Sequence, residues 1–336
     1  MTRVYLTHPS DKLASYYGER ALQALNDVAE VHCNPQPREL TIAELIEEAR
    51  GCDAVIAYRQ TPAPEALFRA LPELNVFLRC AVDIRSVDVS AASAHGVLVT
   101  QASPGYAAAV AEWVIGAMID LARGVSRYAG AYHQGRPLAP FMGRELRDAT
   151  LGIIGYGEIG QAVGTLALAF GMRVCATTLQ PVPPRDRVVA VPLPLLLAES
   201  DFVVCLAPAN TQTANMIGAD TLASMKSGAC FVNAARGELV DEAALLAALD
   251  SGRLAGCALD VGCAPDQMPS PALARHPRVI ATPHIGGLTL PAIEHQALET
   301  VAQLAALLRG ELPPGAVNAE HATRLRRWGH EISTAP

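Results

Sequence analysis

Short apolar runs and helical stretches alternate along the first hundred residues. Runs typical of buried strands occupy 4–8, 28–32, 54–58 and 76–80, and the residues between them carry apolar positions at helical spacing. Strands that alternate with helices form parallel βαβ units. The pattern therefore predicts an α/β domain built on a parallel sheet.

A long apolar helix and a second alternating series follow. Residues 107–128 show a helical pattern with apolar residues on more than one face, which is typical of a helix lying between two domains. Beyond a polar loop, the pattern predicts six further strands, the number of a complete dinucleotide-binding fold, and then a helix over 291–308. The six predicted strands are 151–154, 173–177, 202–206, 230–233, 256–261 and 279–282.

Length and charge narrow the class of protein. The chain has 336 residues, more than the roughly 250–300 at which single cores stop growing, so we expect two domains. Hydrophobic residues make up 51% of the sequence and charged residues 18%, as is typical of a well-buried enzyme. The formal charge is −7 and no basic tract is present, which argues against nucleic acid as a partner.

No segment has the pattern of a membrane span. The most apolar stretch, 107–121, is shorter than the roughly 20 residues that cross a bilayer, and it contains Glu112 and Asp120. The first residues lack the continuous apolar run of a secretory signal, so we expect a cytoplasmic protein without membrane contact. The eight cysteines form no CxxC pair, and we expect them to be small core residues rather than disulfides or ligands of a metal.

The segment LGIIGYGEIGQAVG, residues 151–164, has the pattern of a dinucleotide-binding turn. Gly155, Gly157 and Gly160 follow an apolar strand and open a helical run, which is the context this motif requires. The first glycine permits the tight turn, the second lets the backbone approach the pyrophosphate, and the third lets the helix pack on the strand. The phosphates would lie at the helix N-terminus. The motif predicts binding of NAD or NADP.

The end of the next strand leaves the choice of cofactor open. NAD-binding folds usually place an acidic residue about 20 residues beyond the turn, where it hydrogen-bonds the ribose. This chain has Thr177 and Thr178 there, followed by a loop with Arg185 and Arg187. A hydroxyl does not repel a 2′-phosphate, and Arg185 or Arg187 could reach one, so use of NADP is open. Alternatively, both arginines simply lie in a solvated loop.

Three polar residues follow the later predicted strands. Arg236 comes after VNAA, Asp260 ends the strand of CALDV, and His284 lies in TPHIGG. In open α/β sheets these strand ends face the ligand crevice. A guanidinium there is suited to bidentate contact with a carboxylate, and an imidazole can give a proton to a ketone oxygen and take it back.

These motifs closely resemble those of the D-isomer-specific 2-hydroxyacid dehydrogenases. The resemblance runs from ASPGYAAAVAEWVIG through GIIGYGEIG, VNAARGELVDE and ALDV to TPHIGG, nearly the whole chain. It implies two Rossmann-like or flavodoxin-like α/β domains, and it favours NAD over NADP as the cofactor. Residues 1–100 plus 290–336 would form the substrate domain, and 101–289 the inserted NAD(P)-binding domain.

The resemblance also implies roles for particular residues. Arg236 would hold the carboxylate and carbonyl of the substrate, His284 would be the acid/base, and Asp260 would hold the carboxamide of the nicotinamide. The family commonly forms dimers, so we expect a homodimer, to which the 107–121 helix could contribute. The other residues expected to bind the cofactor are Tyr156, Glu158, Ile159, Ala207, Pro208, Thr213, Ala234, Ala235 and Gly286.

The chain departs from the family pattern at the acid that supports the catalytic histidine. Family members carry a glutamate five residues after the aspartate of ALDV, and this chain has Pro265 there. Asp266 or Gln267 could take its place if the loop shifts, and we expect Asp266 to be catalytic. Without a carboxylate the pKa of the imidazole should fall, which predicts slow catalysis or an altered substrate.

A second departure lies in the loop whose backbone N–H groups take the substrate carboxylate in this family. The expected loop is Ala81, Val82 and Asp83, with Ala81 and Asp83 where glycines are usual. The Asp83 carboxylate would repel a substrate anion unless Arg59, Arg79 or Arg85 neutralises it. Asp83 could instead select a cationic group on the substrate, or simply cap the following segment.

The sequence thus predicts hydride transfer between a nicotinamide and C2 of a small 2-oxo or 2-hydroxy acid. One alternative is a dehydrogenase of the same fold with a non-standard substrate. Another is a catalytically weak, cofactor-binding regulatory protein, which the missing acid favours and the presence of both Arg236 and His284 opposes.

Overall fold

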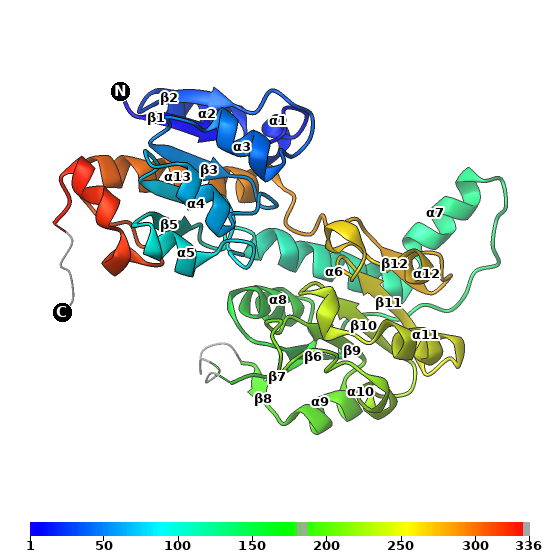
Figure 1. Ribbon diagram of the computed structural model, residues 1–336. Helices are drawn as coiled ribbons and strands as arrows, with labels where there is room; N and C mark the ends of the chain where they lie inside the picture. Colours follow the sequence, from blue (N-terminus) through cyan, green and yellow to red (C-terminus); the bar gives the residue numbers. More distant parts are fainter. Residues whose placement is uncertain (180–181, 183–186, 332–336) are drawn as a thin grey trace. The chain divides into compact units, whose positions relative to one another are not determined.

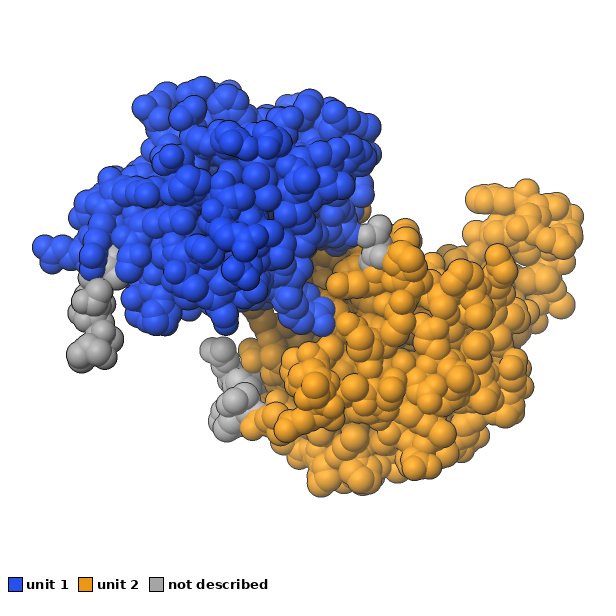
Figure 2. Space-filling view, in the orientation of Figure 1, with its two compact units in different colours: residues 1–105, 289–336 blue, residues 106–288 orange. Residues whose placement is uncertain are grey.

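The chain divides into two compact units. The computed structural model describes residues 1–179, 182 and 187–331. Unit 1 comprises Met1–Gly105 and Thr289–Pro336, and unit 2 comprises Tyr106–Leu288 (Figure 2). Unit 2 is therefore inserted into the sequence of unit 1.

Unit 1 is built on a five-stranded parallel sheet. Its order β2-β1-β3-β4-β5 is that of the flavodoxin-like fold (Figure 1). The central strands β3 and β4 are buried throughout, as expected for parallel strands covered on both faces, whereas β2 at the edge is partly exposed. The strands are β1 (Arg3–Leu6), β2 (Glu30–Cys33), β3 (Ala54–Ala57), β4 (Val76–Arg79) and β5 (Leu98–Gln101).

Alternate residues of these strands point into two apolar layers. Leu6, Ile56 and Leu78 belong to one core cluster, and their neighbours Val55 and Phe77 belong to the other, as the two-residue period of a strand requires. Helix α13 (Leu290–Leu308) packs against α1, α2 and β4, so the last part of the chain completes the first core. The other helices of unit 1 are α1 (Leu13–Tyr16), α2 (Glu19–Asn26), α3 (Ile42–Glu48), α4 (Glu65–Ala70) and α5 (Val89–Ala94), with short 3-10 helices η4 (Ala319–His321) and η5 (Thr323–Trp328).

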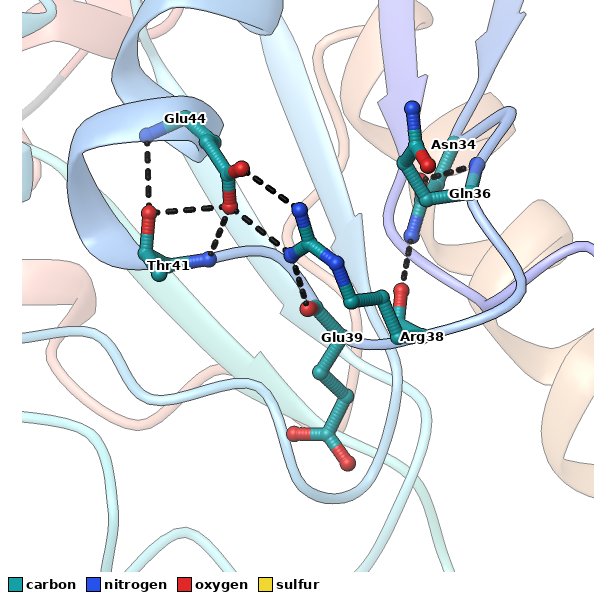
Figure 3. A network of polar contacts seen from close by, with 6 residues as sticks. All are labelled: Asn34, Gln36, Arg38, Glu39, Thr41 and Glu44. Carbon is teal, nitrogen blue, oxygen red and sulfur yellow. Dashed lines mark hydrogen bonds and ion pairs between the residues drawn. The ribbon is translucent and has the colours of Figure 1, made fainter.

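Helix α3 begins with a reciprocal cap. The Thr41 hydroxyl accepts a hydrogen bond from the Glu44 backbone N–H, and the Glu44 carboxylate accepts one from the Thr41 N–H (Figure 3). Arg38 chelates the same carboxylate at 2.6 and 2.9 Å. Hydrogen bonds from Arg38 and Thr41 lower the pKa of Glu44 to about 2, so this cap stays charged across the physiological pH range.

Unit 2 contains a seven-stranded parallel sheet in the order β12-β11-β10-β9-β6-β7-β8. The strand order reverses between β6 and β9, which is the topological switch point where open α/β sheets bind ligands. The strands are β6 (Thr150–Ile154), β7 (Arg173–Thr177), β8 (Val189–Ala190), β9 (Phe202–Cys205), β10 (Ala229–Asn233), β11 (Leu254–Leu259) and β12 (Val279–Ala281).

Helices cover both faces of this sheet and form two separate cores. Helix α6 (Ala107–Arg123) packs on α8 (Glu158–Ala169) and on β10 and β11 (Figure 1). No helix in the described part of the chain is long and apolar enough to cross a membrane. The remaining elements are α7 (Val125–His133), α9 (Leu193–Glu199), α10 (Ala219–Ser224), α11 (Glu242–Asp250), α12 (Pro271–Ala274), η2 (Gly237–Leu239) and η3 (Pro265–Gln267).

Two sequence predictions were wrong in detail. The helix predicted over 107–128 is broken at Gly124, whose φ of 68° is left-handed and ends α6 before α7 begins. Strands β5 and β8 were not predicted; β5 has four residues and β8 only two, so each gives a short pattern.

All eight cysteines are free thiols, and five of them are buried. The prediction that they are core residues is wrong for Cys263, which is exposed.

Candidate active site

The residues predicted to bind the cofactor lie at one edge of the seven-stranded sheet. Because its strands are parallel, the loops that follow β6, β9, β10, β11 and β12 all leave from the carboxyl edge. These loops carry the glycine turn, Ala207–Pro208, Arg236, Asp260 and His284.

The glycine turn after β6 is a tight, sterically restricted corner. Gly155 has a φ of 94°, a conformation that glycine adopts without strain. A Cβ atom there would lie 2.7 Å from the backbone of Leu206 and Ala207, the segment that leaves the neighbouring strand β9. Both the backbone angle and the close approach require glycine at this position.

The other two glycines differ in what surrounds them. A Cβ at Gly160 would lie 2.6 Å from the carbonyl oxygen of Gly155, so helix α8 packs directly on the turn. A Cβ at Gly157 would meet no described heavy atom within 4 Å. Gly157 is also the N-cap of α8, and no described side chain caps this helix. The turn thus leaves backbone N–H groups and open space at a helix N-terminus, which fits the pyrophosphate of a dinucleotide.

The two helix-side glycines give a matched pair of variants. Gly160→Ala is expected to lower stability by about 1–3 kcal/mol, because the added carbon forces the turn to shift. Gly157→Ala has room and an ordinary φ of −80°, so stability should change by less than about 0.5 kcal/mol while the Kd for the cofactor rises. Thermal unfolding and fluorescence titration with NADH and NADPH separate the two effects. Equal cofactor affinity in Gly157→Ala and the wild type would contradict a phosphate position at this turn.

The Thr177 hydroxyl at the end of β7 donates a hydrogen bond to the Val191 carbonyl at 2.7 Å. Thr178 follows, and both residues are partly exposed. Arg187 is exposed and has a φ of 52°, whereas Arg185 lies outside the described residues. Thr177 and Thr178 carry no charge that would exclude NAD or NADP, so these residues do not decide which of the two cofactors binds.

The loop after β9 is held by its own side chains. Thr213 donates its hydroxyl hydrogen to the Pro208 carbonyl at 2.8 Å and accepts a hydrogen bond from the Asn210 N–H at 2.9 Å. Asn210 in turn accepts from the Thr213 N–H. Thr213 therefore stabilises the conformation of this loop. Its hydroxyl is fixed by the bonds to Pro208 and Asn210, so a cofactor would meet it in a defined position.

Arg236 is positioned by a buried residue that sequence reasoning missed. Asn233, the last residue of β10, is fully buried; its amide donates to the Arg236 carbonyl at 2.9 Å and its oxygen accepts from the Ala235 N–H at 3.1 Å. The Arg236 guanidinium, half-buried, donates to the Ala235 carbonyl at 2.7 Å. The sequence did contain a signal for this role, because Asn233 is a polar residue at the end of an apolar strand, three residues before Arg236.

Two glycines bring the loops after β10 and β11 into direct contact. A Cβ at Gly237 would lie 2.1 Å from the backbone of Gly262, and one at Gly262 would lie 2.5 Å from the Met268 carbonyl oxygen. This contact sets the Arg236 loop against the loop that follows Asp260. Sequence alone identified neither glycine, because the contact joins distant segments.

The carboxylate of Asp260 anchors the loop that carries His284. Asp260 is 3% exposed, and its Oδ1 accepts hydrogen bonds from the Thr282 hydroxyl at 2.6 Å and the Ile285 N–H at 2.8 Å. Its Oδ2 accepts one from the Gly286 N–H at 2.7 Å. These bonds bracket His284, whose φ of 56° is left-handed and whose Nδ1 is buried. Asp260 is therefore a structural anchor of this loop.

The segment in place of the family's acid forms the short helix η3. Pro265 starts this helix and Gln267 ends it with a φ of 58°. The backbone of Asp266 lies between them, but its side chain lies outside the described part of the structure. The catalytic role of Asp266 stays a prediction.

The loop predicted to take the substrate carboxylate lies at the carboxyl edge of the sheet of unit 1. Ala81 is buried, while Val82 and Asp83 are partly exposed. Arg85 binds both oxygens of the Asp83 carboxylate, with distances from 2.8 to 3.1 Å, and its N–H donates to Oδ1 at 3.0 Å. Arg85 thus compensates the negative charge of Asp83. The bond from the Arg85 N–H also makes Asp83 a cap of the following segment, which is one of the two roles expected from the sequence.

Metal ligation has no support in the part of the chain that the structure covers. No group of three or more His, Cys, Asp or Glu side chains there could hold a metal ion.

Comparison with known proteins agrees with this geometry. Residues 115–286 match the family model "D-isomer specific 2-hydroxyacid dehydrogenase, NAD binding domain". The chain is 34% identical to a glyoxylate reductase from Thermococcus gammatolerans, over 90% of this chain and 93% of that protein. It is 33% identical to chloroplastic D-3-phosphoglycerate dehydrogenase 3 of Arabidopsis thaliana over 93% of this chain, but it spans only 53% of that relative's length.

The fold is likewise similar to solved structures. D-lactate dehydrogenase from Escherichia coli superposes with a TM-score of 0.80 at 26% identity, covering 94% of this chain and 100% of that one. The fold class expected from the sequence is confirmed. The protein belongs to the family of D-isomer specific 2-hydroxyacid dehydrogenases.

Proposed function

We propose that the protein is an NAD(P)-dependent oxidoreductase that transfers a hydride between the nicotinamide and C2 of a small 2-oxo or 2-hydroxy acid. The observation that carries the proposal is the Asp260 carboxylate, which holds the His284 loop at the same sheet edge as the glycine turn and Arg236. That edge combines a dinucleotide site with a fixed cation and a titratable imidazole.

Each group has a defined task in this reaction. The turn of Gly155, Gly157 and Gly160 would hold the pyrophosphate of the cofactor, whose nicotinamide would supply or accept the hydride. Arg236 binds the substrate carboxylate and polarises its carbonyl. His284 gives its proton to the carbonyl oxygen as C2 is reduced and takes it back from the hydroxyl in the reverse direction. Asp260 keeps the imidazole in place and remains our candidate for the nicotinamide carboxamide.

Turnover with a panel of 2-oxo acids tests the proposal. Purified protein is mixed with NADH or NADPH and with glyoxylate, hydroxypyruvate, pyruvate, or branched and aromatic analogues, and absorbance at the nicotinamide band is followed. We expect reduction of at least one small oxo acid, and the better of the two cofactors identifies the cofactor preference. Tight cofactor binding without reduction of any oxo acid would instead support a regulatory, cofactor-binding protein, the reading that Pro265 in place of the acid favours.

Arg236→Lys tests the assignment of the substrate carboxylate. Lysine keeps the charge but loses the planar fork, so KM for the oxo acid should rise about tenfold or more while cofactor affinity stays the same. Steady-state kinetics at saturating cofactor measures this. An unchanged KM would remove Arg236 from substrate binding.

A homodimer is proposed from the exposed apolar surface of unit 2. Helix α7 has no buried residue and extends from the sheet of unit 2 (Figure 1), with Val125 57% and Tyr132 66% exposed. In the following loop Met142 is 96% exposed. Surfaces of this kind are typical of subunit contacts. Sedimentation equilibrium should give twice the chain mass, and a monomer would contradict the proposal.

We also propose a cytoplasmic location. Free thiols at all eight cysteines suit a reducing compartment. Fractionation of cells expressing the protein tests this.

A further inference from the structure

Arg79, the last residue of β4, is an unusually buried cation. It is 2% exposed and is one of the largest fully buried side chains among the residues that the structure describes. Arginine is rarely buried to this extent unless it is paired. We therefore expect the buried guanidinium to have several hydrogen-bond partners.

The Arg79 guanidinium ties together the loops that follow β3 and β4. Toward the first loop, Nη1 donates to the carbonyls of Tyr58 at 2.9 Å and Thr61 at 2.6 Å, and Nη2 donates to the Arg59 carbonyl. Toward the second loop, Nε donates to the Asp83 carbonyl at 3.1 Å and Nη2 donates to the Ser86 hydroxyl at 2.7 Å. A single rigid fork thus holds both loops at the carboxyl edge of the sheet.

Backbone bonds also join these segments, both at the strand ends, where the Cys80 N–H donates to the Ala57 carbonyl at 3.0 Å, and further along the two loops. Ala63 donates to the Ser86 carbonyl and accepts from the Asp88 N–H, beyond the segment that carries Ala81–Asp83. Nearer the strand ends, the Ala81 carbonyl accepts from the Ala102 N–H, which ties that loop to the chain beyond β5. Arg79 links the backbone of the β3 loop to the backbone of Asp83.

The positive charge of Arg79 is not neutralised by its hydrogen-bond partners. Among the described residues these partners are four carbonyls and one hydroxyl, and none is a carboxylate. The Asp83 carboxylate is bound by Arg85 instead. Burial lowers the pKa of Arg79 to about 10, against the raising effect of nearby Asp83, so the side chain remains charged at neutral pH. A fixed positive charge therefore lies behind the loop 81–83.

We infer that Arg79 is a positioning residue for binding of the substrate carboxylate. It sets the geometry of the loop 81–83 through the Asp83 carbonyl. Because Arg85 already compensates the Asp83 carboxylate, the charge of Arg79 favours binding of an anion where the family's glycines are missing. This inference rests on the proposed function, together with the expectation from the family resemblance that backbone N–H groups of the loop 81–83 also contact the carboxylate of the 2-oxo acid.

Arg79→Lys and Arg79→Met test the inference, with Arg324→Lys as the matched control. Arg324 also donates to two carbonyls of unit 1, those of Leu71 and Leu74 at 2.8 Å, but these residues precede β4 and lie at the opposite edge of the sheet. Lysine at 79 keeps the charge but cannot reach both loops, and methionine removes the charge as well.

The readouts are kcat, KM for glyoxylate or the best oxo acid, Ki for oxamate, and Kd for the cofactor. In Arg79→Lys we expect KM and Ki to rise about tenfold, which is the effect of losing one hydrogen bond to a charged group. We expect kcat to stay within about threefold of the wild-type value and the Kd for the cofactor to stay unchanged. Arg79→Met should raise both further, and Arg324→Lys should change neither. Ser86→Ala, which keeps the charge and four of the five acceptors, should raise KM by less than Arg79→Lys does.

The kinetic results distinguish a failure of the Arg79 inference from a failure of the proposed function. An Arg79→Lys enzyme with KM and Ki within twofold of the wild type overturns the inference, as does an equal rise in Arg324→Lys. If Arg79→Met does not fold, Arg79→Lys and Ser86→Ala decide the question. A wild-type protein that binds cofactor but reduces no oxo acid overturns the proposed function, and this inference with it.

Discussion

Replacing His284 with alanine is expected to lower kcat by about 10²–10⁴, the contribution of a general acid/base. The variant removes the group that we propose to exchange a proton with the substrate oxygen, and it leaves the glycine turn untouched. Cofactor affinity should therefore stay close to that of the wild type. Stopped-flow and steady-state turnover with the best oxo acid measure the loss.

The left-handed backbone at His284 calls for a second variant. Its φ of 56° is unfavourable for alanine, so His284→Ala can also disturb the loop. Asparagine tolerates this conformation and cannot act as an acid/base, so His284→Asn separates the two causes. A kcat within threefold of the wild type in His284→Asn would remove the imidazole from the mechanism.

Replacing Asp260 with alanine is expected to cost both stability and activity. The N–H of Gly286, which is buried, and the Thr282 hydroxyl and Ile285 N–H, which are partly buried, would lose their acceptor. A buried donor left unsatisfied costs about 1–3 kcal/mol, so the free energy of unfolding should fall by at least about that amount. With its anchor gone, the His284 loop no longer holds the imidazole in place, and kcat should fall at least about 10²-fold.

Asp201 provides the control for this prediction. It accepts hydrogen bonds from the Thr150 N–H at 2.9 Å and from Lys226 at 2.7 Å, but it precedes β9 and so lies at the amino edge of the same sheet. Asp201→Ala should lower the unfolding temperature while leaving kcat nearly unchanged. Chemical denaturation and kinetics on both variants measure the difference. Asp260→Ala with full kcat would show that the loop does not depend on this anchor.

Local sequence patterns were sufficient for most of the secondary structure and for the glycine turn. Buried parallel strands are continuous apolar runs, and β3, β4, β6 and β9 were predicted from such runs. The strand–turn–helix context of Gly155 and Gly157 is also contiguous in the chain. Where the signal was short or ambiguous the prediction failed, as at the two-residue strand β8 and at Gly124, which breaks a helix that hydrophobicity alone continues.

The residues that hold the site together were not predictable in the same way. Asn233 was missed because its partners are the backbone of Ala235 and Arg236, and the roles of Gly237 and Gly262 depend on one loop touching another. Asp260 was singled out for the cofactor, whereas its visible contacts are with the loop 282–286. Its hydrogen bonds join positions more than twenty residues apart.

The sequence by itself determined the α/β class, the dinucleotide-binding turn and the family, because each of these depends on residues that are neighbours along the chain. Only the tertiary structure decided which residues support the site: Asp260 beneath His284, Asn233 beneath Arg236, and Arg79 across two loops of unit 1. The roles of Asp260 and Arg79 arise from hydrogen bonds between segments that folding brings together. The role of Asn233 arises from its side-chain bonds to the backbone of its own loop, a conformation that the residue type alone does not specify. The sequence gives the type of each side chain, but it does not show which atoms that side chain contacts in the folded protein.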